Sequence, residues 1–405
     1  MTLEGRDLVS IFDFSDREIE AVFDLADDMD EHKHGCLKIA DGALLSTLFY
    51  EPSTRTRLSF EAAMLRLGGS VISVADARVT SVAKGETIAD TVRIVESYAD
   101  AIVIRHPLEG SARVAADFAS VPVINAGDGA HEHPTQTLLD LYTLRREQGT
   151  LQGLSVALVG DLRFGRTVHS LAFGLARFGA KTTLVSPPGL EMPQHLLDRL
   201  EKEFGSSPAH FHSLGDMVTD SNSLKRRGGR QKALATEVLG TFDAVYVTRV
   251  QRERFDSDRS YQQAKRGYAI TEELLSRARP DALIMHPLPR VDELAYDLDS
   301  DPRAVYFRQA AYGLPIRMAL LTALLGKRPV KVKPSRKGDY RPEPRREVDF
   351  RKLAEVPCPN ERCVTNHERY LRPQFTFVKH DPGLVACAYC EHEIPSPVAS
   401  GETHE

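Results

Sequence analysis

The sequence lacks a long apolar run, a strong excess of one charge and a rich supply of cysteine. No apolar stretch approaches the roughly 20 residues that a helix needs to cross a bilayer, so we expect no membrane segment. The first residues, MTLEGRDLVS, lack the basic segment and apolar run of a signal peptide, and we expect a cytoplasmic protein. The net charge of -5 argues against a chain that coats nucleic acid.

What is present is an alternation of strand-like and helix-like segments in a chain of 405 residues, long enough for two or three domains. Apolar runs typical of buried parallel strands occur at 101–105, 121–126, 155–161, 244–249 and 282–287. Helical patterns lie between them, for example over 54–67, 87–99, 134–146 and 167–178. This alternation predicts a doubly wound α/β fold, in which ligands bind where the strands end.

The segment FYEPSTRTRLSFEAAMLRLGG (49–69) carries a candidate anion site. Apolar residues at helical spacing predict a helix that opens after Pro52 and stops at Gly68-Gly69. Its first turn offers unpaired backbone amides, three hydroxyls and one guanidinium, a set of donors that suits a phosphate. An ordinary Ser-capped helix fits the same run, so this segment alone leaves both interpretations open.

Five motifs in the same order resemble those of the carbamoyltransferase family: PSTRTRLSFE, SVAKGET (81–87), RHP (105–107), HPTQTLLDL (133–141) and HPLPR (286–290). The resemblance implies two α/β domains of carbamoyltransferase type. It also implies that carbamoyl phosphate is held by Ser53, Thr54, Arg55, Thr56 and Arg105. Thr56, Arg105 and His133 would contact the carbamoyl oxygen, with Gln136 near the carbamoyl nitrogen. Attack by an amine drives negative charge onto that oxygen, so fixed donors there lower the barrier.

The acceptor amine follows from two further motifs, GDLRFGRTVHS and TRVQ, which look like those of aspartate carbamoyltransferases. Guanidinium groups pair well with the two carboxylates of aspartate. The resemblance assigns these carboxylates to Arg166, Arg249 and Gln251, and the amino group to the backbone around Pro287 and Leu288. Ornithine transcarbamylases typically carry a Ser-Met-Gly loop, which does not occur in this sequence.

We therefore expect the transfer of a carbamoyl group from carbamoyl phosphate to L-aspartate, the committed step of pyrimidine biosynthesis. The departing phosphate can accept the amine proton, so no covalent enzyme intermediate is needed. Ser81 and Lys84 match a family loop that reaches into the neighbouring subunit, which implies a homotrimer with shared active sites. The loop has Ala83-Lys84 where well-known members have two lysines. Two alternatives stay open: a carbamoyltransferase for another amine, and a catalytically silent scaffold.

Four of the five cysteines lie in the last fifty residues, as Cys358-x4-Cys363-x23-Cys387-x2-Cys390. This spacing predicts a structural zinc site of four thiolates, one zinc per chain, with His367 as a competing ligand that we disfavour. The segment resembles the zinc domain of the aspartate carbamoyltransferase regulatory chain, so the protein resembles a fusion of the two chains. We favour this interpretation over a zinc ribbon for nucleic acid, and a higher oligomer could form through the module. FTFV (375–378) predicts a short strand.

The resulting domain scheme has four parts. They are a carbamoyl phosphate-binding domain over 1–148, completed by a C-terminal helix at about 300–328, an aspartate-binding domain over 149–299, a linker over 329–352, and a zinc-binding domain with a short tail over 353–405. The linker is rich in proline and charged residues, which favours a solvated tether. For the basic run KRRGGRQK (225–232) we favour a surface loop over an active-site lip or an oligomer contact.

Overall fold

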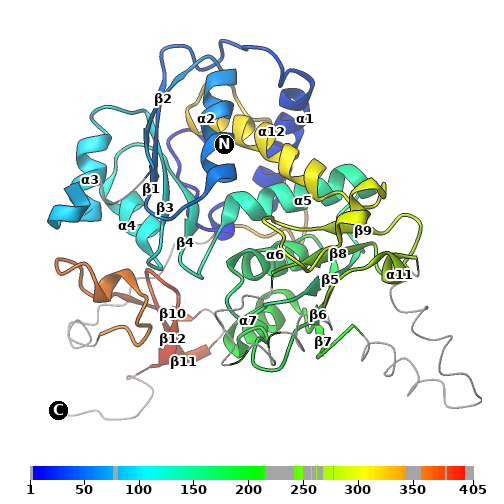
Figure 1. Ribbon diagram of the computed structural model, residues 1–405. Coiled ribbons are helices and arrows are strands. Elements are labelled where there is room, and N and C mark those ends of the chain that lie inside the picture. Colours follow the sequence, from blue (N-terminus) through cyan, green and yellow to red (C-terminus); the bar gives the residue numbers. More distant parts are fainter. Residues whose placement is uncertain are drawn as a thin grey trace, which may run out of the picture. The chain divides into compact units, whose positions relative to one another are not determined.

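The computed structural model describes residues 3–75, 81–214, 241–249, 257, 261, 268–276, 278–342, 357–378 and 381–396 (Figure 1). The chain forms two compact units. The first comprises Met1–Leu138 with Leu314–Glu405, and the second comprises Leu139–Gly313. Among the described residues, no helix is long and apolar enough to cross a membrane.

The first unit contains a four-stranded parallel sheet in the order β2-β1-β3-β4. Its strands are β1 (Leu44–Phe49), β2 (Ser70–Val74), β3 (Ala101–His106) and β4 (Val123–Asp128). Figure 1 shows helices on both faces of this sheet, with α3 and α4 on one side and α1 and α2 on the other. The helical segments are η1 (Ile11–Asp13), α1 (Asp16–Glu31), α2 (Thr54–Arg66), η3 (Ser81–Lys84), α3 (Ile88–Val95) and α4 (Ser111–Phe118). Because both faces are covered, β3 and β4 are buried along their whole length.

Helix α2 forms where the apolar spacing predicts it. It ends at Arg66 with Leu67 as its C-cap residue, and Gly68 follows with φ +88°, a left-handed conformation that glycine adopts without steric penalty. The helix buries Phe60, Ala63 and Met64, whereas Leu58 and Leu65 are about half exposed, at 50% and 57%. The leucines that help to predict the helix are therefore not the residues that pack it onto the sheet.

The second unit contains a five-stranded parallel sheet in the order β7-β6-β5-β8-β9. Its strands are β5 (Ser155–Val159), β6 (Lys181–Val185), β7 (Ala209–Phe211), β8 (Ala244–Val247) and β9 (Leu283–Met285). Its helical segments are α6 (Arg166–Arg177), α7 (Gln194–Phe204), α11 (Glu272–Leu275) and η5 (Tyr296–Ser300). Two longer helices, α5 (Pro134–Gln148) and α12 (Tyr306–Leu324), contribute residues to both units. The expected α/β fold is confirmed in both units.

The described C-terminal residues 357–378 and 381–396, here called the zinc module, form a small antiparallel sheet in the order β10-β11-β12. Its elements are η6 (Val364–Asn366), β10 (Phe375–Val378), β11 (Asp381–Cys387) and β12 (Glu393–Pro395). The expected strand at 375–378 is thus confirmed. Val364, Phe375 and Val385 share one apolar core with Ile88 of α3 and Val114 of α4, so the module packs within the first unit.

Most side chains of residues 329–342, the described part of the expected linker, are exposed. Three contacts nevertheless attach this segment to α1. Asp339 pairs with the buried guanidinium of Arg17 at 2.6 Å, and Lys333 pairs with an exposed aspartate of the same helix. Asp16 accepts a hydrogen bond from Tyr340 N at 2.7 Å. The first part of the linker therefore lies along the first unit.

Candidate active site and metal centre

The predicted phosphate residues of the first unit gather at one edge of its sheet. In the strand register Phe49 lies beside Arg105, and His106 lies beside Asp128, so β1, β3 and β4 end at nearly the same level. The loop to α2, the end of β3 and the loop to α5 therefore leave the sheet together. This is the edge at which open α/β sheets bind ligands.

The start of α2 has the features of an anion site. Ser53 is the N-cap residue, with extended backbone (φ -160°), but its hydroxyl makes no capping hydrogen bond. The amides of Thr54, Arg55 and Thr56 belong to the first turn, where a helix supplies no carbonyl partner. Thr54 and Arg55 are exposed and Thr56 is buried. Backbone amides, hydroxyls and the positive end of the helix dipole thus lie within one turn.

Arg105 is held in place at the end of β3. Its Nη2 donates to Glu51 Oε1 at 2.6 Å, and its Nη1 donates to the carbonyl of Ala126 at 3.3 Å. Its own carbonyl accepts a hydrogen bond from Tyr50 N at 2.8 Å. The guanidinium is therefore buried between the ends of three adjacent strands with its orientation fixed. Glu51 is a functional candidate that the sequence did not indicate, although it directly precedes the PSTRTR motif.

His133 and Gln136 lie at the start of α5. His133 is buried, and its carbonyl accepts hydrogen bonds from Gln136 N at 3.0 Å and from the next amide at 3.2 Å. The loop before it is fixed by Asp128, which accepts hydrogen bonds from Asn125 Nδ2 at 3.0 Å and from Glu132 N at 3.1 Å. Folding thus positions His133 through backbone contacts of α5 and of the loop.

His106, next to Arg105, is a buried neutral imidazole. Its Nδ1 accepts a hydrogen bond from Leu108 N at 3.1 Å, which requires the unprotonated nitrogen. Burial lowers the pKa of His106 to about 4, although the charge of Asp128 opposes this shift. His106 therefore supports the loop after β3 and carries no positive charge at neutral pH.

The predicted aspartate residues lie in the second unit, where β5, β8 and β9 are consecutive neighbours. Arg166 begins α6 after β5, and Arg249 follows β8; both are half-buried. Pro287 and Leu288 follow β9 and are half-buried as well. Gln251 and the basic 220–238 segment lie outside the described residues.

A buried pair that sequence reasoning missed supports the turn after β9. His286 Nε2 lies 2.8 Å from Glu293 Oε1, while His286 Nδ1 accepts a hydrogen bond from Leu288 N at 2.8 Å. Burial alone would raise the pKa of Glu293, but the hydrogen bond from His286 keeps it below its usual value. The pair holds Leu288, whose φ is +54°, in a conformation that is uncommon for leucine. The two residues are seven positions apart across a loop, a spacing that predicts no contact, so the sequence did not indicate this pair.

Ser81 and Lys84 form the short helix η3, and both side chains are exposed. Residues 76–80 before them lie outside the described part of the chain. The 3-10 helix presents Lys84 to solvent four residues before the start of α3 at Ile88.

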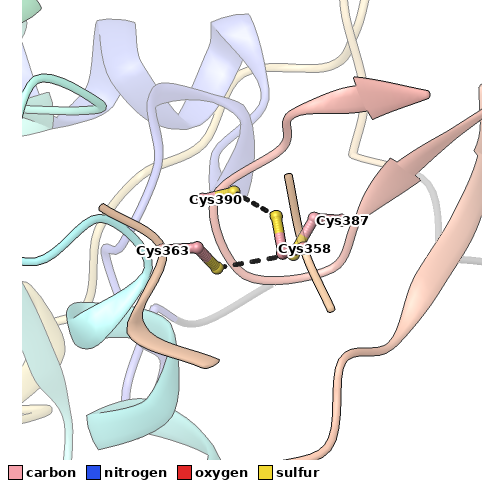
Figure 2. Close-up of side chains that lie close together, drawn as sticks. All are labelled: Cys358, Cys363, Cys387 and Cys390. Carbon is pink, nitrogen blue, oxygen red and sulfur yellow. Dashed lines mark hydrogen bonds between the residues drawn. The ribbon is translucent and has the colours of Figure 1, made fainter. Parts of the chain in front are cut away.

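The four predicted ligand cysteines come together in the zinc module (Figure 2). All are buried and none is in a disulfide. Their Sγ atoms all lie within 4.8 Å of one another, with Cys358–Cys390 at 3.6 Å and Cys363–Cys387 at 3.8 Å. Tetrahedral zinc with Zn–S bonds of about 2.3 Å requires S···S distances of about 3.8 Å, so the residues fit. Hydrogen bonds from neighbouring thiols, Cys358 foremost, lower the pKa of Cys363. His367 is exposed and contacts the Glu361 carbonyl.

Comparison with known proteins identifies the family of each part of the chain. The family model of the aspartate/ornithine carbamoyltransferase carbamoyl-P binding domain matches residues 6–146, and that of the Asp/Orn binding domain matches 152–324. The metal binding domain of the aspartate carbamoyltransferase regulatory chain matches 353–397.

Individual relatives cover the same part of the chain. The aspartate carbamoyltransferase catalytic subunit of Thermoplasma acidophilum is 48% identical over 326 residues, 80% of this chain and 99% of the relative. The solved catalytic subunit of M. jannaschii aspartate transcarbamoylase is 45% identical, with a TM-score of 0.70 over 79% of this chain and 98% of that one. Trypanosoma cruzi aspartate transcarbamoylase with N-(phosphonacetyl)-L-aspartic acid is 40% identical, with a TM-score of 0.71 over 80% and 97%.

Proposed function

The chain belongs to the aspartate/ornithine carbamoyltransferase family, and we propose from this how its own residues transfer a carbamoyl group to L-aspartate. It is an aspartate carbamoyltransferase of pyrimidine biosynthesis, joined to a zinc domain of the regulatory type. The observation that carries the proposed mechanism is the anion site at the start of α2, level with the fixed guanidinium of Arg105.

We assign the phosphate of carbamoyl phosphate to Ser53, Thr54, Arg55, Thr56 and Arg105. Thr56, Arg105 and His133 donate to the carbamoyl oxygen, and Gln136 binds the carbamoyl nitrogen. The buried contacts of Arg105 and His133 support these roles, because donors that are already oriented need no reorganisation as charge develops. The proton of the attacking amine leaves with the phosphate, so no side chain forms a covalent bond to substrate.

For aspartate we assign the carboxylates to Arg166, Arg249 and Gln251, and the amino group to the backbone around Pro287 and Leu288. The adjacency of β5, β8 and β9 supports this grouping, because the carboxyl ends of neighbouring parallel strands lie close together. The His286–Glu293 pair would position the turn that binds the amine.

We propose that Ser81 and Lys84 complete the active site of a neighbouring subunit in a homotrimer. Both side chains are exposed in the single chain. A residue that contacts the active site of another subunit must be accessible in this way. The half-exposed Leu58 and Leu65 of α2 supply apolar surface that such an assembly could cover. A higher oligomer would then use the zinc module.

The zinc domain holds one structural zinc in this proposal, bound by Cys358, Cys363, Cys387 and Cys390. All four ligands are protein thiols, which leaves no open position for catalysis. We propose that the carbamoyl phosphate-binding domain ends at 148 and the aspartate-binding domain begins at 149. The helix at about 300–328 completes the first domain, and 329–352 form the linker.

The test is a steady-state assay of purified protein with carbamoyl phosphate and either L-aspartate or L-ornithine, detecting the ureido product. We expect turnover with aspartate only, inhibited by N-(phosphonacetyl)-L-aspartic acid in competition with carbamoyl phosphate. Arg249→Ala should raise KM for aspartate far more than KM for carbamoyl phosphate. Turnover with ornithine would favour the other carbamoyltransferase, and no turnover with either would favour the scaffold.

A further inference from the structure

The zinc module contacts the first turn of α3 with two polar side chains. Glu368 Oε1 accepts a hydrogen bond from Ile88 N at 3.3 Å, and Tyr370 Oη accepts one from Ala89 N at 3.2 Å. First-turn amides have no carbonyl partner inside their own helix. Two of these donors in α3 are therefore satisfied by residues that lie some 280 positions later in the chain.

The local sequence caps only part of this turn. Thr87 is the N-cap residue, and its hydroxyl accepts a hydrogen bond from Asp90 N at 3.1 Å. The Glu368 carboxylate adds a negative charge at the positive end of the helix dipole. The start of α3 is thus stabilised jointly by its own N-cap and by the zinc module.

The contact belongs to a packed interface. The ring of Tyr370 packs edge-on against Phe118 of α4, with ring centroids 5.8 Å apart. Nearby, Glu109 N donates to the carbonyl of Arg362 at 3.0 Å, and Val364 N donates to the carbonyl of Glu109 at 2.9 Å. These backbone bonds and the shared apolar core fix the position of Tyr370 relative to α3.

The capped turn follows the Ser81–Lys84 helix after three residues. Glu86 N donates to the carbonyl of Ser81 at 3.3 Å, and Glu86 Oε2 accepts a hydrogen bond from Thr91 Oγ1 at 3.2 Å. The segment that carries Lys84 is therefore tied to α3 at its C-terminal end. Whatever fixes the start of α3 also fixes this end of the segment.

We propose that the zinc module, through Glu368 and Tyr370, positions the loop that carries Lys84 for catalysis. The inference rests on the proposed role of Lys84 in the active site. Glu368 and Tyr370 are positioning residues in this view, because they act on the reaction through α3 and the loop. The module then contributes to carbamoyl transfer in addition to any role in assembly.

The experiment compares full-length, zinc-loaded protein with the double variant Glu368→Ala/Tyr370→Phe. Phe keeps the ring on Phe118 and removes only the acceptor. We expect unchanged zinc content and hydrogen exchange of the amides of 81–92 that is about five- to thirty-fold faster, the effect of losing a helix cap. Glu361→Ala, an exposed residue of the same module, should leave this exchange unchanged. Unchanged exchange in the double variant would disprove the capping contact.

Activity then separates positioning from simple stabilisation. We expect the double variant to lose kcat several-fold in the wild-type background, but less than about twofold in a Lys84→Met background, because coupled residues are non-additive. Equal losses in both backgrounds, or faster exchange with unchanged kcat, would overturn the positioning role. If the wild-type chain has no carbamoyltransferase activity, the proposed function fails, while the exchange result still reports on the cap.

Discussion

At the scale of single residues, the structure shows how a charged side chain can be both buried and useful. Arg105 is nearly inaccessible, and its contacts with Glu51 and the Ala126 carbonyl compensate for its burial. The RHP motif indicates Arg105 as a candidate, but only the fold shows that Glu51 orients its side chain.

Arg105→Lys should lower kcat by about 10²–10³, because a lysine cannot reproduce the planar fork that serves Glu51 and the substrate together. Steady-state kinetics with carbamoyl phosphate and aspartate measure this loss. Arg57→Lys is the matched control. Arg57 lies in the first turn of α2, but its guanidinium pairs with Glu61 at 3.6 Å. A loss of similar size in both variants would show that the arginine fork is not specific to catalysis.

The buried imidazole of His106 predicts a pH dependence of stability. Its folded pKa of about 4 lies below the unfolded value of 6.5, so the unfolded state binds more protons between these limits. The contribution of neutral His106 to the free energy of unfolding is therefore present above pH 6.5 and is lost as the pH falls toward 4. Urea unfolding should show that wild type loses about 2 kcal/mol more than His106→Gln between pH 7.5 and pH 5. Parallel losses in the two proteins would contradict this assignment.

At the scale of elements, the sequence predicts where helices and strands form, but not which of their faces are buried. Periodicity and the Gly68 stop locate α2 correctly, yet Leu58 and Leu65 lie on its exposed side. Their exposure depends on what covers α2, which the spacing of apolar residues does not specify. The same limit applies to α3, since no local pattern could reveal that Tyr370 caps it.

Gly110, which precedes α4, tests the contact between this helix and the zinc module. Its φ is +85°, and a Cβ there would lie 2.7 Å from the backbone of Tyr389. Gly42 has a similar φ of +77° with nothing within 4 Å. Gly42→Ala should thus cost only about 1–2 kcal/mol of conformational strain. Gly110→Ala should lower the free energy of unfolding, measured in urea, by at least about twice as much as Gly42→Ala. Equal losses would show that Tyr389 moves aside.

At the scale of the whole molecule, the four-cysteine spacing predicted that these cysteines come together, but the packing of their module into the first unit was not foreseen. Spacing describes the ligands, whereas Val364, Phe375 and Val385 are ordinary apolar residues whose partners in α3 and α4 are distant in sequence. The linker is a similar case, because its composition indicates a tether and hides the contact of Asp339 with Arg17. Long-range pairs of common residue types leave no local signal.

The distribution of thiols predicts a simple chemical readout. Cys36 is exposed and the four cluster cysteines are buried. A thiol reagent should therefore modify one cysteine quickly in the zinc-loaded protein, and Cys36→Ser should remove this fast phase. Chelation should make the other four reactive, because free thiolates are nucleophiles while zinc-bound ones are held in the cluster. Several fast thiols before chelation would mean that the cluster does not retain metal.

The shared core predicts how metal loss affects the remainder of the first unit. If zinc supplies the folding free energy of the small module, chelation unfolds the module. Ile88 and Val114 then lose apolar partners, and α3 loses two caps. Calorimetry should show the midpoint of the carbamoyl phosphate-binding domain falling by several degrees after chelation, since about 1 kcal/mol corresponds to a few degrees in domains of this size. A module transition that disappears while the domain midpoint stays constant would mean that the two fold independently.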